Sequence, residues 1–135
     1  MKILLDTHIF LWYITKNKSL PSTLIPVIRD PENDVYLSSV SVWEVIVKYQ
    51  LGKLPLPQAP ATFIPEQRRY HQISSLPLDE ASVSNLENLS ARHKDPFDRM
   101  LICQAIQHQL SLVTTDQALQ AYVEHVSLLP KKADD

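Results

Sequence analysis

Residues 2–6 read Lys2-Ile3-Leu4-Leu5-Asp6, a short apolar run that ends in a carboxylate. Such a run predicts a short buried strand. The residues that follow, Thr7–Thr15, carry the apolar content of a helix that packs on this strand. A strand followed at once by a helix is the first unit of an α/β domain, so this stretch indicates the fold class.

The rest of the chain repeats the same alternation. Further strands are predicted at Val35–Ser39, Ile73–Leu76 and Ser111–Thr114, with a last short strand near Val126. Further helices are predicted at Pro21–Asp30, Ser41–Leu51, Ala61–Tyr70, Asp79–Leu89 and Pro96–Leu110, with a short one from Gln117. Pro26 is expected to kink or break its helix. Alternating strands and helices predict a largely parallel sheet of four to five strands.

Capping residues support three of these helix ends. Gly52, the only glycine in the chain, follows the helix Ser41–Leu51 and is expected at its C-terminal cap. Asp79 is a predicted N-cap. Asp95 is another, with Pro96 at the first helical position, where proline is favoured.

The composition is typical of a single soluble globular domain. The chain has 135 residues, 44% of them hydrophobic and 21% charged, with a net charge of −2. We expect a domain over residues 1–129 and a solvated tail over 130–135. No apolar run approaches the roughly 20 residues that span a bilayer. An acid at position 6 argues against a secretory signal, so we expect a cytoplasmic protein that does not contact a membrane.

Four acids stand where the predicted sheet would place a ligand. Asp6 ends the first strand and Asp116 follows the strand Ser111–Thr114. Ligands of parallel sheets bind outside the carboxyl ends of the strands, so both acids are expected at the same edge. Capping is the simpler alternative for Asp6, Asp98 and Asp116, each of which stands near a predicted helix start.

Glu44 is harder to explain by a structural role. Its helix is apolar over most of its circumference, apart from a thin polar stripe formed by Ser41, Glu44 and Lys48. An exposed Glu44–Lys48 pair at i, i+4 is the simpler alternative. An acid in a mostly buried helix otherwise needs a partner, and carboxylate oxygens are the ligands that Mg²⁺ and Mn²⁺ prefer. Without such a cation, clustered acids would repel one another.

Other cofactor classes are disfavoured by the sequence. The five histidines and the single cysteine, Cys103, show no zinc-ligand spacing, and one cysteine excludes an internal disulfide. A single glycine excludes glycine-rich phosphate loops. Basic side chains that could contact RNA phosphates, or could equally be solvated helix ends or partners of nearby acids, are Lys48, Arg68, Arg69, Arg92, Lys94 and Arg99.

Four segments together resemble the PIN-domain family, in particular the VapC-type toxins of bacterial toxin–antitoxin pairs. They are Leu4-Leu5-Asp6-Thr7-His8, the stretch Leu37–Glu44, the stretch Asp95–Ala105 that begins Asp-Pro-Phe-Asp-Arg, and Leu112-Val113-Thr114-Thr115-Asp116. Of these four segments, Asp95–Ala105 is the most specific. The order and spacing of the segments cover nearly the whole chain, from about residue 2 to 128.

The resemblance implies a three-layer α/β/α fold and a metal-dependent ribonuclease. It assigns Asp6, Glu44, Asp98 and Asp116 as the acidic site for Mg²⁺ or Mn²⁺, and Thr7, Ser39, Asp95 and Thr114 as supporting residues. It also implies RNA as substrate, a cognate antitoxin, frequent homodimers, and products with 5′-phosphate and 3′-hydroxyl ends.

Two other functions remain compatible with these residues. One is a non-catalytic RNA-binding or regulatory module of the same fold. The other is a phosphatase with an acidic site, although Asp6-Thr7-His8 lacks the Asp-x-Asp pair of a phospho-aspartate mechanism.

Overall fold

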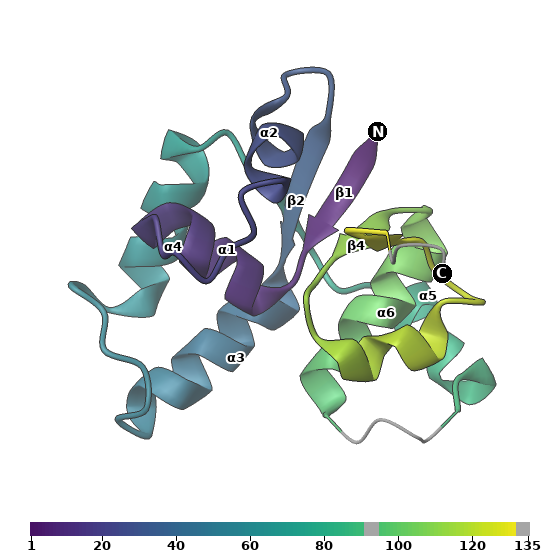
Figure 1. Ribbon diagram of the computed structural model, residues 1–135. Coiled ribbons are helices and arrows are strands. Elements are labelled where there is room, and N and C mark those ends of the chain that lie inside the picture. The colour runs from purple at the N-terminus through teal and green to yellow at the C-terminus, as the bar shows by residue number, and fades with distance from the viewer. Residues whose placement is uncertain (91–94, 132–135) are drawn as a thin grey trace.

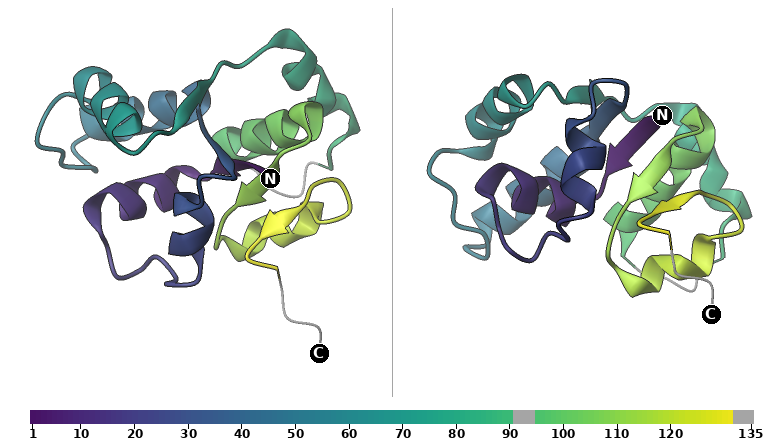
Figure 2. Two further views of the ribbon diagram at one scale, coloured as in Figure 1. Left: turned by 90° about the horizontal axis from the view of Figure 1, so that it is seen from above. Right: turned by 45° about the horizontal axis from the view of Figure 1, so that its top comes forward.

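The computed structural model describes residues 1–90 and 95–131, and within them it has a five-stranded, all-parallel sheet. The strands follow the order β3-β2-β1-β4-β5, with β1 in the centre. Their bounds are β1 Lys2–Leu5, β2 Asp34–Ser38, β3 Ser74–Leu76, β4 Ser111–Val113 and β5 Leu128–Leu129. Helices lie on both sides of the sheet (Figures 1 and 2), so the expected three-layer α/β/α arrangement is confirmed.

The alternation of β1 builds both layers. Ile3 and Leu5 enter one hydrophobic core, together with side chains of α1 (Thr7–Thr15), α2 (Leu24–Arg29) and α4 (Pro60–Tyr70). Leu4 points to the other face and packs with α6 (Pro96–His108). All three strand residues are fully buried. A central parallel strand is covered on both faces, which is why this stretch is apolar without alternation.

The remaining elements lie at the margins of these layers. Helix α3 (Ser39–Gln50) contacts both α4 and α6. Helix α5 (Glu80–Ser84) packs on α6, followed by the 3₁₀ turn η1 (Asn85–Asn88), and a second 3₁₀ turn, η2 (Gln117–Tyr122), lies between β4 and β5. No helix among the described residues is long and apolar enough to cross a bilayer.

Several predicted boundaries were wrong, each for a local reason. The second strand ends at Ser38 and α3 begins at Ser39, because the Ser38 hydroxyl accepts a hydrogen bond from the amide of Val40 and caps the helix. Helix α2 starts only at Leu24. Pro26 therefore occupies the first turn, where no intrahelical amide bond is needed, and it produces no break.

The predicted helix Asp79–Leu89 was also too long. It divides into α5 and η1 near Asn85, whose side-chain amide donates to the carbonyl of Cys103 on α6. The last strand, expected near Val126, lies at Leu128–Leu129.

The predicted caps are confirmed. Asp79 accepts from the amide of Ser82, and Asp95 accepts from the amides of Phe97 and Asp98 at the start of α6. Gly52 follows α3 with φ +71°, a left-handed conformation that favours glycine. Pro130 and Lys131 are exposed, and the rest of the expected tail lies outside the described residues.

Candidate active site

Asp6 lies at the centre of the carboxyl edge of the sheet. It follows β1, and its amide donates to the carbonyl of Val113 at 2.9 Å, so the ends of β1 and β4 are joined there. The chain adds β2 and then β3 on one side of β1, and it then crosses over to place β4 and β5 on the other side. In open α/β sheets this switch point is where ligands bind.

The Asp6 carboxylate is buried and only half satisfied. Its side chain is 4% exposed, and Oδ2 accepts a hydrogen bond from the Thr114 hydroxyl at 2.7 Å. The other oxygen, Oδ1, is buried with no hydrogen-bond partner among the described residues. Burial is the main cause that raises the pKa of Asp6. The charge of Glu44 adds to this effect, whereas the Thr114 hydroxyl, the nearby His8 and the backbone of Thr7 oppose it. Such an oxygen needs a cation or a donor to offset its desolvation.

Glu44 belongs to the same site and is held differently. It is 2% exposed on α3. Its Oε1 accepts from the Thr7 hydroxyl at 2.7 Å, and its Oε2 lies 2.5 Å from the Lys48 ammonium. The Thr7 and Ser41 hydroxyls are 2.8 Å apart. Because each hydroxyl carries one proton, Ser41 is the donor in that pair when Thr7 donates to Glu44.

Asp116 reaches the site through Thr114. The Asp116 amide donates to the Thr114 hydroxyl at 3.1 Å, and that hydroxyl in turn donates to Asp6. The Asp116 side chain is exposed, and its Oδ1 accepts from the amide of Ala118, so it caps η2. The capping alternative therefore applies to one oxygen of Asp116, while its backbone orders the neighbouring hydroxyl.

Asp98 lies in the first turn of α6 and is 8% exposed. Helix α6 precedes β4 and runs back along it, so its first turn lies at the level where β4 ends (Figure 1). The rings of Trp43 and Phe97 pack edge to face with centroids 4.6 Å apart, which joins the first turn of α6 to α3. These are the immediate neighbours of Glu44 and Asp98 in the chain. Capping of α6 is done by Asp95, so Asp98 is not needed for that role.

The donor set fits a hard divalent cation. Within residues 1–90 and 95–131, no three His, Cys, Asp or Glu side chains lie close enough together to hold a metal ion between them. Mg²⁺, however, usually keeps several waters and is bound through one or two carboxylates. Asp6 and Glu44 supply such a pair, and the unpartnered Oδ1 of Asp6 is a free ligand oxygen.

The expected supporting residues divide into two groups. Thr7 and Thr114 are buried and donate to Glu44 and Asp6 respectively. Ser39 is exposed, and its hydroxyl accepts from the amide of Leu78, while Asp95 caps α6.

Sequence reasoning did not single out Ser38 and Gln104, which bond to each other in the interior. The sequence pattern placed Ser41 in the polar stripe with Glu44 and Lys48 but indicated no role for its hydroxyl. Apolar periodicity gives no signal for a buried polar pair whose partners are far apart in sequence.

Among the described residues, the expected RNA-contacting side chains divide between the two edges of the sheet. Arg68 and Arg69 lie in the last turn of α4, which precedes β3 and therefore ends near the amino edge of the sheet. Arg99 follows Asp98 in α6, and its Nε is buried without a hydrogen-bond partner among the described residues. Lys48 pairs with Glu44. Arg92 and Lys94 lie outside the described residues.

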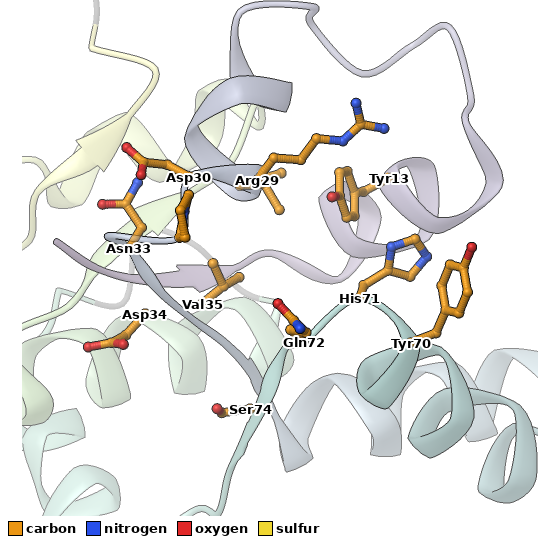
Figure 3. Close-up of a pocket in the computed structure, with 12 residues that line it drawn as sticks. Tyr13, Arg29, Asp30, Asn33, Asp34, Val35, Tyr70, His71, Gln72 and Ser74 are labelled. Atoms are coloured by element: carbon orange, nitrogen blue, oxygen red, sulfur yellow. The ribbon is translucent and has the colours of Figure 1, made fainter.

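Two cavities of about 430 Å³ each lie away from the acids. The first is at the amino edge of the sheet, where Tyr13, Arg29 and His71 project around the start of β2 (Figure 3). The second lies between the end of α1 and α2 and shares Tyr13 and Arg29 with the first. None of the four acids lines either cavity, so we assign the chemistry to the carboxyl edge on the grounds of its buried charges.

The chain is similar to known proteins both in sequence and in fold. A family model for the PIN domain matches residues 3–124. Ribonuclease VapC16 of Mycobacterium tuberculosis is 36% identical over 59 residues, which is 44% of this chain and 42% of that protein's length.

Two solved structures share the fold over nearly the whole chain. A chain from the structure of VapBC2 from Rickettsia felis bound to a promoter DNA fragment has a TM-score of 0.70 at 16% identity, covering 95% of this chain and 97% of that one. A chain of VapBC-5 from Mycobacterium tuberculosis, described as a member of the VapBC family of toxin–antitoxin systems, has a TM-score of 0.60 at 18% identity, with 94% of both chains covered.

Proposed function

The chain belongs to the PIN-domain family, and on that premise we propose that it is a ribonuclease that hydrolyses RNA phosphodiester bonds with the help of Mg²⁺ or Mn²⁺. The observation that carries the proposal is the buried pair Asp6 and Glu44 at the switch point of the sheet. Burial, with a smaller contribution from the charge of Glu44, raises the pKa of Asp6, and Asp6 Oδ1 has no hydrogen-bond partner among the described residues. Lys48 balances the charge of Glu44, and a divalent cation at the open oxygen of Asp6 would balance the charge of Asp6.

The four acids take different parts in this proposal. Asp6 and Asp98 would hold the principal metal, and Glu44 and Asp116 would complete the site directly or through water. A bound divalent ion lowers the pKa of water and neutralises charge on a phosphate that is being attacked. The Thr114 hydroxyl fixes Oδ2 of Asp6, which leaves Oδ1 as the outward ligand oxygen. The Thr7 hydroxyl fixes Oε1 of Glu44 in the same manner.

We further propose that the chain is the toxin of a VapBC-type pair and acts in the cytoplasm. The similarity to ribonuclease VapC16 and the shared fold with chains from VapBC structures support this proposal. A cognate antitoxin would then be the protein partner, and a homodimer the expected assembly. Co-expression with the product of a small neighbouring reading frame, followed by affinity purification, tests the antitoxin: recovery of both chains in one complex is expected.

The test of the enzyme is incubation of the purified protein with total RNA in Mg²⁺, in Mn²⁺ and in EDTA, followed by mapping of the new ends. We expect cleavage with either metal, none in EDTA, and products with 5′-phosphate and 3′-hydroxyl ends. Asp6→Asn should lower the rate at least 100-fold, because it removes a metal ligand from the reacting centre.

Asp34→Asn is the matched control, because it removes one negative charge as Asp6→Asn does. Asp34 is an exposed acid at the amino end of β2, away from the candidate site. It should cleave at the wild-type rate. RNA that stays intact with both metals would contradict the proposed ribonuclease activity. The remaining alternative would be a non-catalytic RNA-binding module, and a filter-binding assay would detect its RNA binding. Hydrolysis of a phosphomonoester in place of RNA would favour a phosphatase.

A further inference from the structure

Lys48 is the side chain that already neutralises Glu44. It lies one helical turn after Glu44 on α3, with its ammonium 2.5 Å from Oε2. The two side chains differ in exposure, 36% for Lys48 and 3% for Glu44. The pair is therefore not the ordinary exposed i, i+4 contact, which contributes about 0.3–0.5 kcal/mol. One of its members is a buried carboxylate that depends on the other for its charge balance.

The hydrogen bonds divide the four oxygens of the pair Asp6 and Glu44 into three kinds. Two of them, Asp6 Oδ2 and Glu44 Oε1, accept from threonine hydroxyls that are themselves buried. Asp6 Oδ1 has no partner among the described residues. Glu44 Oε2 is the one held by a cationic side chain. The oxygens that are not fixed by hydroxyls are thus one open oxygen on Asp6 and one oxygen on Glu44 that a monovalent ammonium covers.

The charges favour an exchange at Glu44 Oε2. The ammonium covers the oxygen of Glu44 that a divalent ion at this site would bind. Two cations at one carboxylate oxygen repel each other, so binding of the divalent ion opposes retention of the ammonium there. Lysine is also suited to leave, because its ammonium is strongly hydrated and its four-carbon stem is flexible. With the side chain 36% exposed, it can turn toward water without a movement of α3.

We propose that Lys48 is a displaceable counter-ion, which holds Glu44 while the site is free of metal and is released from Oε2 when a divalent cation binds. This inference rests on the proposed metal site, but not on RNA as the substrate. It makes Lys48 a residue that sets the metal concentration at which the site fills. The same release frees a cationic side chain at the edge of the site at the moment when a substrate phosphate can bind.

Two opposite effects follow for a variant without the ammonium. The metal-free protein is less stable, because Glu44 keeps its buried charge and loses its partner. The metal binds more tightly, because it no longer has to displace a competitor. A lysine that merely adds stability to α3 would produce only the first effect.

The experiment is Mn²⁺ titration of the full chain at pH 7, followed by calorimetry and by the electron paramagnetic resonance signal of free Mn²⁺. Lys48→Met is compared with Lys53→Met, which removes the same charge from an exposed position just beyond α3. We expect the Kd for Mn²⁺ to fall about tenfold or more in Lys48→Met and to change less than about twofold in Lys53→Met. Lys48→Arg, which keeps a cation, should bind Mn²⁺ much as the wild type does.

Thermal unfolding provides the second readout. Without metal, Lys48→Met should unfold at a lower temperature than the wild type and Lys53→Met, and saturating Mn²⁺ should close that gap. Lys48→Gln repeats the measurement if the methionine variant does not fold. Unchanged or weaker Mn²⁺ binding in the folded variants would overturn the proposal, as would the absence of Mn²⁺ binding by every protein tested.

The outcomes also separate this inference from the proposed function. A wild type that binds Mn²⁺ and leaves RNA intact contradicts the ribonuclease, and the Kd ratio of Lys48→Met to wild type still decides the role of Lys48. A wild type that cleaves RNA with metal, together with unaltered Mn²⁺ binding by Lys48→Met, contradicts only the displaceable counter-ion.

Discussion

Asp6 and Glu44 lie close together, and burial together with the charge of Glu44 raises the pKa of Asp6, yet the two carboxylates are stabilised unequally. Both oxygens of Glu44 have a partner, a hydroxyl and an ammonium. Asp6 has one hydroxyl and one unpartnered oxygen among the described contacts. At the scale of single residues, the protein therefore keeps an unfavourable carboxylate at its centre, which is the usual condition of a ligand-binding acid.

Asp6→Asn should stabilise the metal-free protein, and more so as the pH rises from about 4 to 7. Burial raises the pKa of Asp6 above the ordinary value of 3.8. Between the unfolded and folded pKa values the unfolded chain has already lost this proton, so increasing pH favours unfolding. Asparagine does not titrate, so the Asp6→Asn protein does not lose stability in this way as the pH rises. Circular dichroism melts in EDTA at several pH values should show a difference of a few degrees at pH 7 that shrinks toward pH 4.

Mn²⁺ should reverse that order. The wild type gains stability by binding the ion, and Asp6→Asn loses a ligand and gains little. A stability difference that is independent of pH in EDTA would mean that the Asp6 charge is not the cause. Asp34→Asn, at an exposed carboxylate, is the control and should melt as the wild type does under both conditions.

Single residues were predictable to the extent that their chemistry shows in the sequence. Asp6 and Glu44 stood out because each is an acid inside an apolar context, and the structure places both at one edge. The pairing of Glu44 with Lys48 was also foreseen, but as an exposed contact, whereas Glu44 is 2% exposed. The sequence alone cannot give the depth of one member of an i, i+4 pair, because that depth depends on which helix covers it.

At the scale of elements, caps were the most reliable signals. Asp95 precedes Pro96, and its Oδ1 accepts from two amides in the first turn of α6. The break between α5 and η1 lies at Asn85, whose side chain donates to the carbonyl of Cys103. That partner comes from another part of the chain, so a local pattern does not contain it.

Asp95→Ala should lower the free energy of unfolding by about 1 kcal/mol, while Asp95→Asn should cost only a few tenths, since asparagine also caps. Urea unfolding measures both values. If Asp95 acts only as the cap, Asp95→Asn also leaves Mn²⁺ affinity and RNA cleavage unchanged. Loss of Mn²⁺ binding in a stable Asp95→Asn protein would instead give Asp95 a direct role in the metal site.

Gln104 connects the elements that carry the site. From α6 its Oε1 accepts from the Ser38 hydroxyl, and its Nε2 donates to the carbonyl of Pro77 at 3.2 Å. Ser38 in turn caps α3. Gln104→Met keeps the volume but leaves the buried Ser38 hydroxyl without this partner, so we expect a loss of about 1–3 kcal/mol in urea unfolding. In a double-mutant cycle with Ser38→Ala, the two losses should not add, and additive losses would contradict the link.

At the scale of the whole molecule, the strand order decides what becomes a site. Five parallel strands follow from the alternating pattern, but the order β3-β2-β1-β4-β5 does not, since several orders satisfy the same pattern. That order puts Asp6 beside the end of β4. The last turn of α4, with Arg68 and Arg69, lies at the opposite edge for another reason, because α4 leads into the start of a parallel strand. The acids could thus be grouped from sequence through their resemblance to a family, while the basic residues could not be placed.

Cys103 reports on whether this molecule opens as one unit. It is fully buried on α6 in the core opposite α1, and burial raises the pKa of its thiol, so reaction with a thiol reagent requires opening of the fold. If α6 opens only with the whole molecule, Mn²⁺ at 100 times its Kd should slow labelling about 100-fold, because the ion binds only the native state. Asp6→Asn should show no such slowing. A labelling rate of wild-type Cys103 that is the same with and without Mn²⁺ would mean that α6 opens locally. Asp98 would then move away with α6 while Asp6, Glu44 and Asp116 stay in place.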